Sequence, residues 1–175
     1  MPIPDPVLPD RVLVEAERLS QASGLTFEVI ACDPALADTA QFCEAYGYSL
    51  ADSANTILVV GKSEPRMYVV CLVLADSRLD VNGEVRRRLG TRKASFAGAD
   101  ETATLTGMTI GGVTVVGLPA SLPVWIDARV MERTSIVLGG GGRDRKLIAP
   151  PTWLLGRPQA TPGATVEVVQ GLAKH

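Results

Sequence analysis

Histidine is almost absent from this chain, and its absence excludes several classes of enzyme. The single histidine, His175, is the last of 175 residues, where protein chains tend to fray. A Ser-His-Asp triad, a Cys-His pair or a histidine-bearing zinc site would therefore depend on a poorly held residue. We expect none of these three kinds of site.

Cysteine and long apolar runs are also scarce. The three cysteines, Cys32, Cys43 and Cys71, lie far apart in apolar sequence, which is typical of small buried side chains. No stretch of about 18 apolar residues could span a membrane, and the start of the chain lacks the basic and apolar regions of a secretory signal. We therefore expect a cytoplasmic protein without a metal or a cofactor.

Charge of neither sign is in large excess. A net charge of −2 and a pI near 5.4 argue against a protein that coats nucleic acid. Two basic clusters nevertheless occur, namely Arg86, Arg87 and Arg88 with Arg92 and Lys93, and Arg143, Arg145 and Lys146. Because arginine matches phosphate geometry, each cluster is either a contact for a nucleic-acid backbone or an ordinary solvated face.

Breaker residues and apolar spacing divide the chain into short helices and strands. Residues 1–24 are expected to form a proline-rich arm and a helix, capped by Asp10 and ended by Gly24, that packs on a domain of residues 25–175. A second helix, which Asp38 can cap, should present Phe42, Ala45 and Tyr46 as its apolar face.

Strands neighbour strands more often than they alternate with helices, which favours an α+β fold. The pair 55–60 and 67–75 is the strongest predicted hairpin. Further strands are expected at 25–31, 93–97, 124–127, 135–138, 146–149 and 165–169, and further helices at 82–90, with Asn82 as its cap, 100–106, 128–133 and 150–155.

A glycine-containing loop at residues 107–117 is the segment around which we interpret the rest. Gly111, Gly112 and Gly117 lie among β-branched residues, so backbone N–H groups should be exposed between two strand-like segments. Such a loop could form the wall of a pocket for a small polar ligand. The alternative is that these are ordinary hairpin glycines.

Two further features leave alternatives open. The run Gly139–Gly142 is not followed by Gly-Lys-Ser/Thr or by a helix, which excludes a phosphate loop and leaves a flexible hairpin turn or a second pocket wall. Asp127 ends an apolar strand, where a carboxylate either binds a ligand or caps the next helix.

Five segments in order resemble the YbaK / prolyl-tRNA synthetase-associated domain family, over about residues 31–171. The resemblance rests on Ala54-Asn-Thr-Ile-Leu-Val59, Leu74-Ala-Asp-Ser-Arg-Leu-Asp80, Leu105-Thr-Gly-Met-Thr-Ile-Gly-Gly-Val-Thr114, Leu122-Pro-Val-Trp-Ile-Asp127, and the glycine turn with Pro150-Pro-Thr-Trp-Leu154. It implies a mixed, mostly antiparallel, barrel-like sheet surrounded by helices. It also implies trans hydrolysis of the ester of mischarged tRNA carrying a small amino acid such as Cys, Ala or Ser, without a cofactor.

The resemblance also implies a set of site residues. Asn55, Gly111 and Gly112 would be catalytic, and Thr56, Val113, Thr114, Asp127, Gly140, Gly141 and Gly142 would bind substrate. Arg86, Arg87, Arg143, Arg145 and Lys146 would contact tRNA. The partner is then the 3′ end of aminoacyl-tRNA, while a synthetase partner and the oligomeric state stay open.

Two positions depart from the family pattern. Asn55 stands where the family has a lysine, so the charge that would orient the substrate and stabilise oxyanion character is missing from that position. Val115 stands where the loop of the family has a proline, so a fixed φ is lost. The alternative function is therefore a non-catalytic module that binds a nucleotide, an aminoacyl group or a protein.

Overall fold

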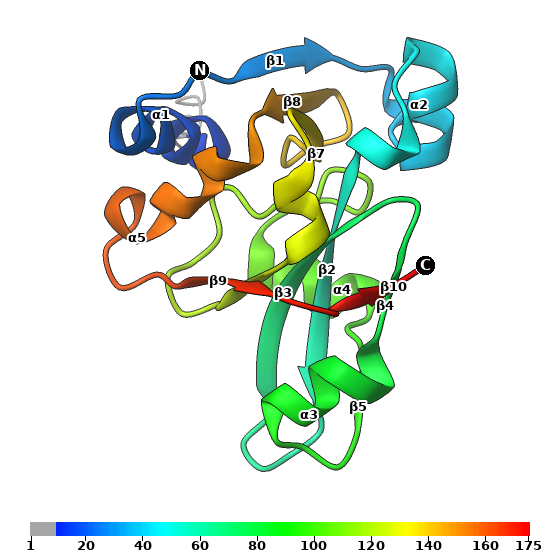
Figure 1. Ribbon diagram of the computed structural model, residues 1–175, viewed down its shortest axis with the longest axis vertical. Coiled ribbons are helices and arrows are strands. Elements are labelled where there is room, and N and C mark those ends of the chain that lie inside the picture. The colour runs from blue at the N-terminus through cyan, green and yellow to red at the C-terminus, as the bar shows by residue number, and fades with distance from the viewer. Residues whose placement is uncertain (1–9) are drawn as a thin grey trace, which may run out of the picture.

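A long antiparallel hairpin of β2 (Ala54–Gly61) and β3 (Met67–Leu74) forms the centre of the structure, a computed structural model that describes residues 10–175. Both strands are rich in β-branched residues, and the hairpin confirms the strongest sequence prediction. It lies within a five-stranded sheet of order β5-β2-β3-β6-β9 (Figure 1). Strand β5 (Ala94–Phe96) pairs antiparallel with β2, whereas β6 (Val124–Asp127) and β9 (Val166–Val169) continue the sheet in parallel. The predicted proline-rich arm at residues 1–9 lies outside the described residues.

A second, antiparallel sheet has the order β1-β8-β7, with β1 at Glu28–Ala31, β8 at Arg145–Ala149 and β7 at Ile136–Gly139. Ser53, just before β2, bridges to Val137 in β7 and so joins the two sheets. Strands β10 (Ala173–Lys174) and β4 (Arg78–Leu79), which the sequence did not predict, form a small separate pair. The mixed, mostly antiparallel α+β fold is confirmed, but the described strands form open sheets and do not close into a barrel.

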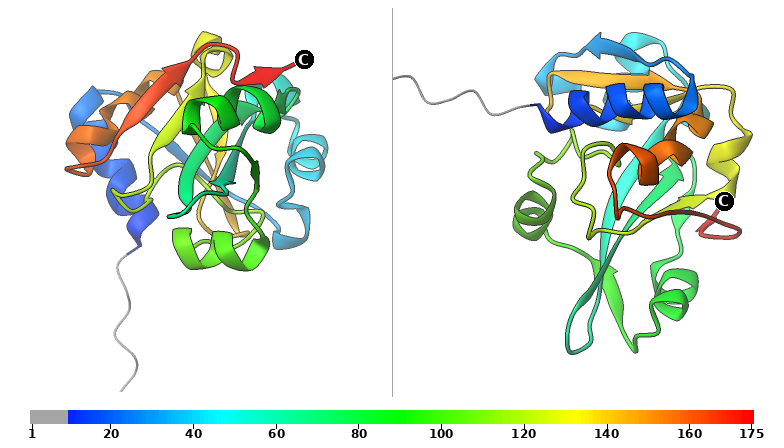
Figure 2. Two further views of the ribbon diagram at one scale, coloured as in Figure 1. Left: turned by 90° about the horizontal axis from the view of Figure 1, so that it is seen from below. Right: turned by 90° about the vertical axis from the view of Figure 1, so that its left-hand side faces the viewer.

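Helix α1 (Arg11–Ser23) has the predicted ends. Asp10 accepts a hydrogen bond from the amide of Leu13, and Gly24 ends the helix in the left-handed conformation. Its buried face includes Ala16 and Leu19 and packs against the 3₁₀ helix Pro151–Gly156, which leads into α5 (Arg157–Ala160). Figure 2 shows α1 lying across this C-terminal helical segment.

Helix α2 (Thr39–Tyr46) ends at Gly47 as predicted, but its apolar face differs from the prediction. Phe42 and Cys43 are buried, whereas Ala45 and Tyr46 are exposed. Tyr46 lies on the same side as Phe42 and stacks on its ring, with the centroids 4.8 Å apart, but remains 37% exposed. Short 3₁₀ segments flank it at Pro34–Leu36 and Leu50–Asp52.

The predicted helix at 82–90 is a π-helical turn, Val81–Val85, that continues into α3 (Arg86–Leu89). Its cap is Asp80 and not Asn82, because the Asp80 carboxylate accepts the amides of Gly83 and Glu84. Helix α4 (Ala99–Thr106) ends at Gly107. Residues 107–123 then form turns without the flanking strands that we expected. A 3₁₀ helix at Ala128–Glu132 follows β6.

The central sheet is covered on both faces. One core places α1 and Trp153 against Leu58, Val70 and Leu72, and the other places α3 against Val59, Val69 and Cys71. Strand alternation therefore puts Asn55 and Ile57 on the α3 face and Thr56 on the other. None of the helices within residues 10–175 combines the length and apolarity needed to cross a membrane.

Candidate functional site

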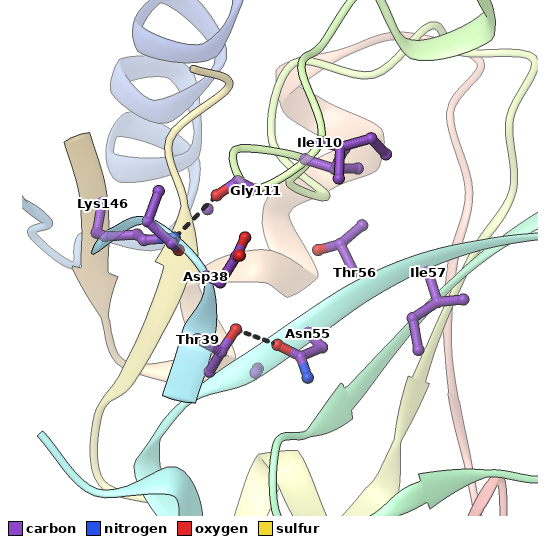
Figure 3. A pocket seen from close by; sticks show the side chains of 12 residues that line it. Asp38, Thr39, Asn55, Thr56, Ile57, Ile110, Gly111 and Lys146 are labelled. Carbon is purple, nitrogen blue, oxygen red and sulfur yellow. Dashed lines mark hydrogen bonds between the residues drawn. The ribbon is translucent and has the colours of Figure 1, made fainter. Parts of the chain in front are cut away.

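A cavity of about 290 Å³ lies at the start of β2. Its walls come from Asn55, Thr56 and Ile57 of β2, from Asp38 and Thr39 at the start of α2, from Ile110, Gly111 and Val113 of the central loop, and from Gly139 and Lys146 (Figure 3). Elements far apart in the sequence thus meet around one space. Of the residues predicted for the site, Asn55, Thr56, Gly111, Val113 and Lys146 line it.

Two glycine loops support this wall by direct backbone contact. A Cβ on Gly112 would lie 2.3 Å from the carbonyl oxygen of Gly142, and one on Gly139 would lie 2.2 Å from that of Val113. The amide of Gly141 also donates to the carbonyl of Gly112 at 2.6 Å. Glycine is needed here because the two backbones touch. Of the run Gly139–Gly142, only Gly139 lines the cavity. The other three glycines lie outside the cavity, where Gly141 and Gly142 contact the backbone of Gly112.

Asn55 is held by the first turn of α2. The Thr39 hydroxyl donates to Asn55 Oδ1 at 2.7 Å, so the amide oxygen is occupied and the Nδ2 group is left as a donor. Within the described residues no acceptor contacts that nitrogen. Asn55 thus offers the pocket hydrogen-bond donors without a net charge.

The hydroxyl of Thr56 is buried in the wall and has no hydrogen-bond partner within residues 10–175. An unpaired buried hydroxyl costs on the order of 1–3 kcal/mol. Because Thr56 lines the cavity, a bound polar group could supply the missing partner.

Some backbone amides of the central loop donate hydrogen bonds within the described residues, and others do not. The amide of Gly112 donates to the Thr109 carbonyl at 2.8 Å, and that of Thr114 contacts the Met108 sulfur at 3.4 Å. The amides of Gly111 and Val113 have no acceptor in the part of the chain described. Gly111 and Val113, and not Gly112 or the buried Thr114, therefore present free N–H groups beside the cavity.

Lys146, predicted to contact tRNA, lies in the pocket wall. Its side chain is buried, and its ammonium donates to the carbonyls of Ala37 at 2.5 Å and Gly111 at 2.9 Å. Burial lowers the pKa of this ammonium group. The nitrogen also lies 5.5 Å from the centre of the Phe42 ring. Lys146 therefore supplies a cation to the wall opposite Asn55.

Arg143 and Arg145 are committed to contacts within the protein. Arg143 donates to the Asp38 carboxylate at 3.1 Å and to the Ile110 carbonyl at 3.0 Å, which braces the rim of the pocket. Arg145 makes two hydrogen bonds to Asp10, of 2.6 and 2.8 Å. Both side chains stay partly exposed, and their contact with tRNA stays a prediction.

Asp127 and the first basic cluster lie elsewhere. Asp127 is buried near the C-terminal segment, where burial raises the pKa of its carboxyl group, and its side chain does not cap the following helix. Arg86 and Arg87 lie on α3, at the far end of the central hairpin (Figure 1). None of the three lines the cavity.

Sequence reasoning missed the contributions of Asp38, Thr39 and Ile110 to the pocket. Asp38 was interpreted only as a helix cap, yet its side chain makes no cap hydrogen bond and faces Arg143 instead. The sequence did hold one signal for the pocket. Lys146 follows the glycine run in a strand whose next residues are apolar.

The comparisons agree on a fold and a family. The crystal structure of hypothetical protein APE2540 is similar with a TM-score of 0.72 and 25% identity, over 89% of this chain and 98% of that one. A proposed trans-editing enzyme for prolyl-tRNA synthetase has a TM-score of 0.71 and 22% identity, over 96% and 99% of the two chains. The model of the aminoacyl-tRNA editing domain matches residues 33–155, and the chain therefore belongs to that family.

Proposed function

We propose that the chain hydrolyses the ester of mischarged aminoacyl-tRNA in trans, with the aminoacyl group and terminal ribose in the pocket at the start of β2. The observation that carries this proposal is the buried hydroxyl of Thr56 in the pocket wall, which has no partner among residues 10–175. Family membership supports the reaction class. The Asn55 amide and the free loop amides add donors around the same space.

Ester hydrolysis needs stabilisation of the negative charge that develops on the carbonyl oxygen. Water attacks the carbonyl carbon, the bond to the ribose oxygen breaks, and that oxygen takes up a proton. The amides of Gly111 and Val113 are fixed donors suited to the developing charge, and one such donor is commonly worth on the order of 10² in rate. Histidine is not required for this part of the chemistry.

Lys146 supplies charge that Asn55 lacks. Its ammonium holds the carbonyl of Gly111, and in this proposal it keeps the neighbouring loop amide directed at the ester. A cation buried beside the cavity also favours the oxyanion, because a partly desolvated site screens charge less than water does. Asn55 would then orient the ribose or the amino acid through its Nδ2 group.

A small substrate side chain suits the cavity. Its volume of about 290 Å³ is at the low end for small-molecule pockets, so the aminoacyl group and ribose leave little spare room. One similar structure is that of a proposed trans-editing enzyme for prolyl-tRNA synthetase. We therefore propose Ala, Ser or Cys on tRNA for proline as the first substrates to test.

A second candidate is a non-catalytic binding module, favoured by the uncharged Asn55 at the start of β2. The pocket would then hold an aminoacyl group or a nucleotide without turnover. The same assay separates the two candidates.

The test is release of labelled amino acid from a panel of mischarged tRNAs that includes Ala, Ser and Cys on tRNA for proline. Gly111→Val is the loss-of-function variant, because a Cβ there would lie 2.0 Å from the Arg143 guanidinium and the φ of Gly111 is +92°. Gly163→Val is the matched control, since Gly163 also has a positive φ of +87° but has open space around it. We expect turnover by the wild type and Gly163→Val, and loss with Gly111→Val.

Circular dichroism and thermal unfolding would establish that both variants fold. Absence of turnover by folded wild-type protein across the whole panel would contradict the deacylase and support the binding module. Equal turnover by folded Gly111→Val would place the chemistry outside this pocket.

A further inference from the structure

Positive charge is concentrated at the far end of the β2–β3 hairpin. Residues 61–68 and 84–96 carry seven cationic side chains against two carboxylates, Glu64 and Glu84, in a chain whose net charge is −2. The first stretch is the hairpin end, and the second runs from α3 to the edge strand β5. The rest of the chain is correspondingly acidic, so charge is distributed very unevenly along the chain.

The fold brings these two stretches together. The amide of Lys62 donates to the carbonyl of Lys93 at 2.9 Å, and a Cβ on Gly61 would touch the side chains of Thr91 and Leu89. Helix α3 and the turn after it therefore lie against the hairpin end, at the lower end of the molecule in Figure 1 and in the right-hand view of Figure 2. We call Lys62, Arg86, Arg92 and Lys93 the distal basic surface.

These four side chains differ from their basic neighbours in lacking an acidic partner. Arg66, Arg87 and Arg88 pair with Glu101, Glu84 and Glu167 respectively. No carboxylate among residues 10–175 forms a salt bridge with the four members of the distal basic surface. Lys62, Arg92 and Lys93 are exposed and Arg86 is half-buried. Unpaired, exposed cations gathered on one surface are the usual footprint of contact with a nucleic-acid backbone.

We propose that the distal basic surface binds the phosphate backbone of an RNA duplex. If the proposed function holds, that duplex is the paired stem that carries the aminoacylated 3′ end. The unpaired end would then run along the edge strand β5 into the pocket. The surface supplies affinity without sequence recognition, since phosphate contacts position the RNA and base contacts specify it.

The central hairpin sets the separation of the two sites. Asn55 is the second residue of β2 and lies in the pocket, whereas Gly61 ends the strand at the basic surface. The two are about 20 Å apart at the usual strand rise. A few unpaired nucleotides can cover this distance. Phe96 pairs with Val59 between the two sites and is 59% exposed. It lies on the same face of the sheet as Asn55, and an exposed ring there can stack on an unpaired base.

Binding of uncharged tRNA transcript, measured over a salt series, tests the proposal independently of catalysis. The test variant is the double substitution Lys62→Glu and Lys93→Glu, and Arg11→Glu on α1 is the control for a change of charge at the opposite end. We expect the double variant to bind at least tenfold more weakly and to lower the slope of log affinity against log salt by about two. The control should bind like the wild type.

A double variant that binds tRNA as tightly as the wild type, or an Arg11→Glu variant that weakens it equally, would overturn the proposal. Binding by the wild type that does not change with salt would overturn it as well. Failure of the proposed function is separable, because it is read on an aminoacylated CCA trinucleotide, which lacks the paired stem that the distal basic surface would bind. We expect the double variant to hydrolyse that trinucleotide at the wild-type rate and full-length aminoacyl-tRNA more slowly.

Discussion

Thr39 fixes the orientation of Asn55 through a hydrogen bond of 2.7 Å from its hydroxyl to Asn55 Oδ1. The two residues come from different elements, the first turn of α2 and the start of β2 (Figure 3). An asparagine amide can present either end to a ligand, and the hydroxyl selects one of them. The contact turns an ambiguous side chain into a donor.

Thr39→Val should therefore weaken deacylation without unfolding the protein. Valine keeps the shape of threonine but cannot donate, so Asn55 is free to present its oxygen to the substrate. We expect kcat/KM on aminoacyl-tRNA to fall about tenfold, in line with the loss of one hydrogen bond of about 1 kcal/mol or slightly more. Thr165→Val, at an exposed position, is the matched control. Unchanged kcat/KM in Thr39→Val would show that Asn55 does not act through this orientation.

Thr56→Val should raise the stability of the protein and lower its activity. The Thr56 hydroxyl is buried and has no partner in the described part of the chain, so its replacement by a methyl group should raise the free energy of unfolding by about 1 kcal/mol. The same change removes a donor and acceptor from the pocket and should lower kcat/KM. Urea unfolding and the deacylation assay measure the two effects. A variant that gains stability and keeps full activity would mean that no substrate group uses the hydroxyl.

Local signals predicted much of the fold but little of the pocket. The caps at Asp10 and Gly24 and the hairpin of β2 and β3 depend on short-range pattern, and the structure has them. Lys146 was predicted on the surface because three cations lie within four residues, yet β8 places the Lys146 side chain in the interior and leaves Arg145 partly exposed. The contacts that make the pocket join α2, β2, β8 and the central loop, and no pattern within one segment specifies them.

The buried pair of Glu15 and Arg157 ties α1 to the rest of the domain. Their charged atoms lie 3.5 Å apart, with side chains 6% and 2% exposed. Arg157 also donates to the carbonyls of Leu122 and Thr165. Arg157→Met should cost about 3–5 kcal/mol of unfolding free energy, because it leaves Glu15 charged and buried without its partner.

The double variant Glu15→Leu and Arg157→Met tests that explanation. It removes both charges, so it should recover much of the lost stability in urea unfolding. If the double variant is no more stable than Arg157→Met alone, the loss in Arg157→Met does not arise from the unpaired, buried charge of Glu15.

Asp127 should make stability depend on pH. Burial raises the pKa of its carboxyl group in the folded protein above the ordinary value of 3.8, although the amides of Leu172 and Ala173 oppose the shift. The folded state then holds this proton more tightly than the unfolded state, so the contribution of Asp127 to stability is present in acid and is lost as pH rises through the raised pKa. At neutral pH the ionised, buried carboxylate is destabilising.

Asp127→Asn should therefore stabilise the protein at neutral pH by about 1 kcal/mol, because neither carboxylate oxygen has a well-formed hydrogen bond to lose within residues 10–175. The gain should vanish below the ordinary aspartate pKa, where both states carry the proton. Urea unfolding across this pH range measures the effect, with the exposed Asp76→Asn as the matched control. Destabilisation of Asp127→Asn at neutral pH would instead show that the carboxylate anchors the C-terminal segment through the amides of Leu172 and Ala173, and that these amides outweigh the cost of burying its charge.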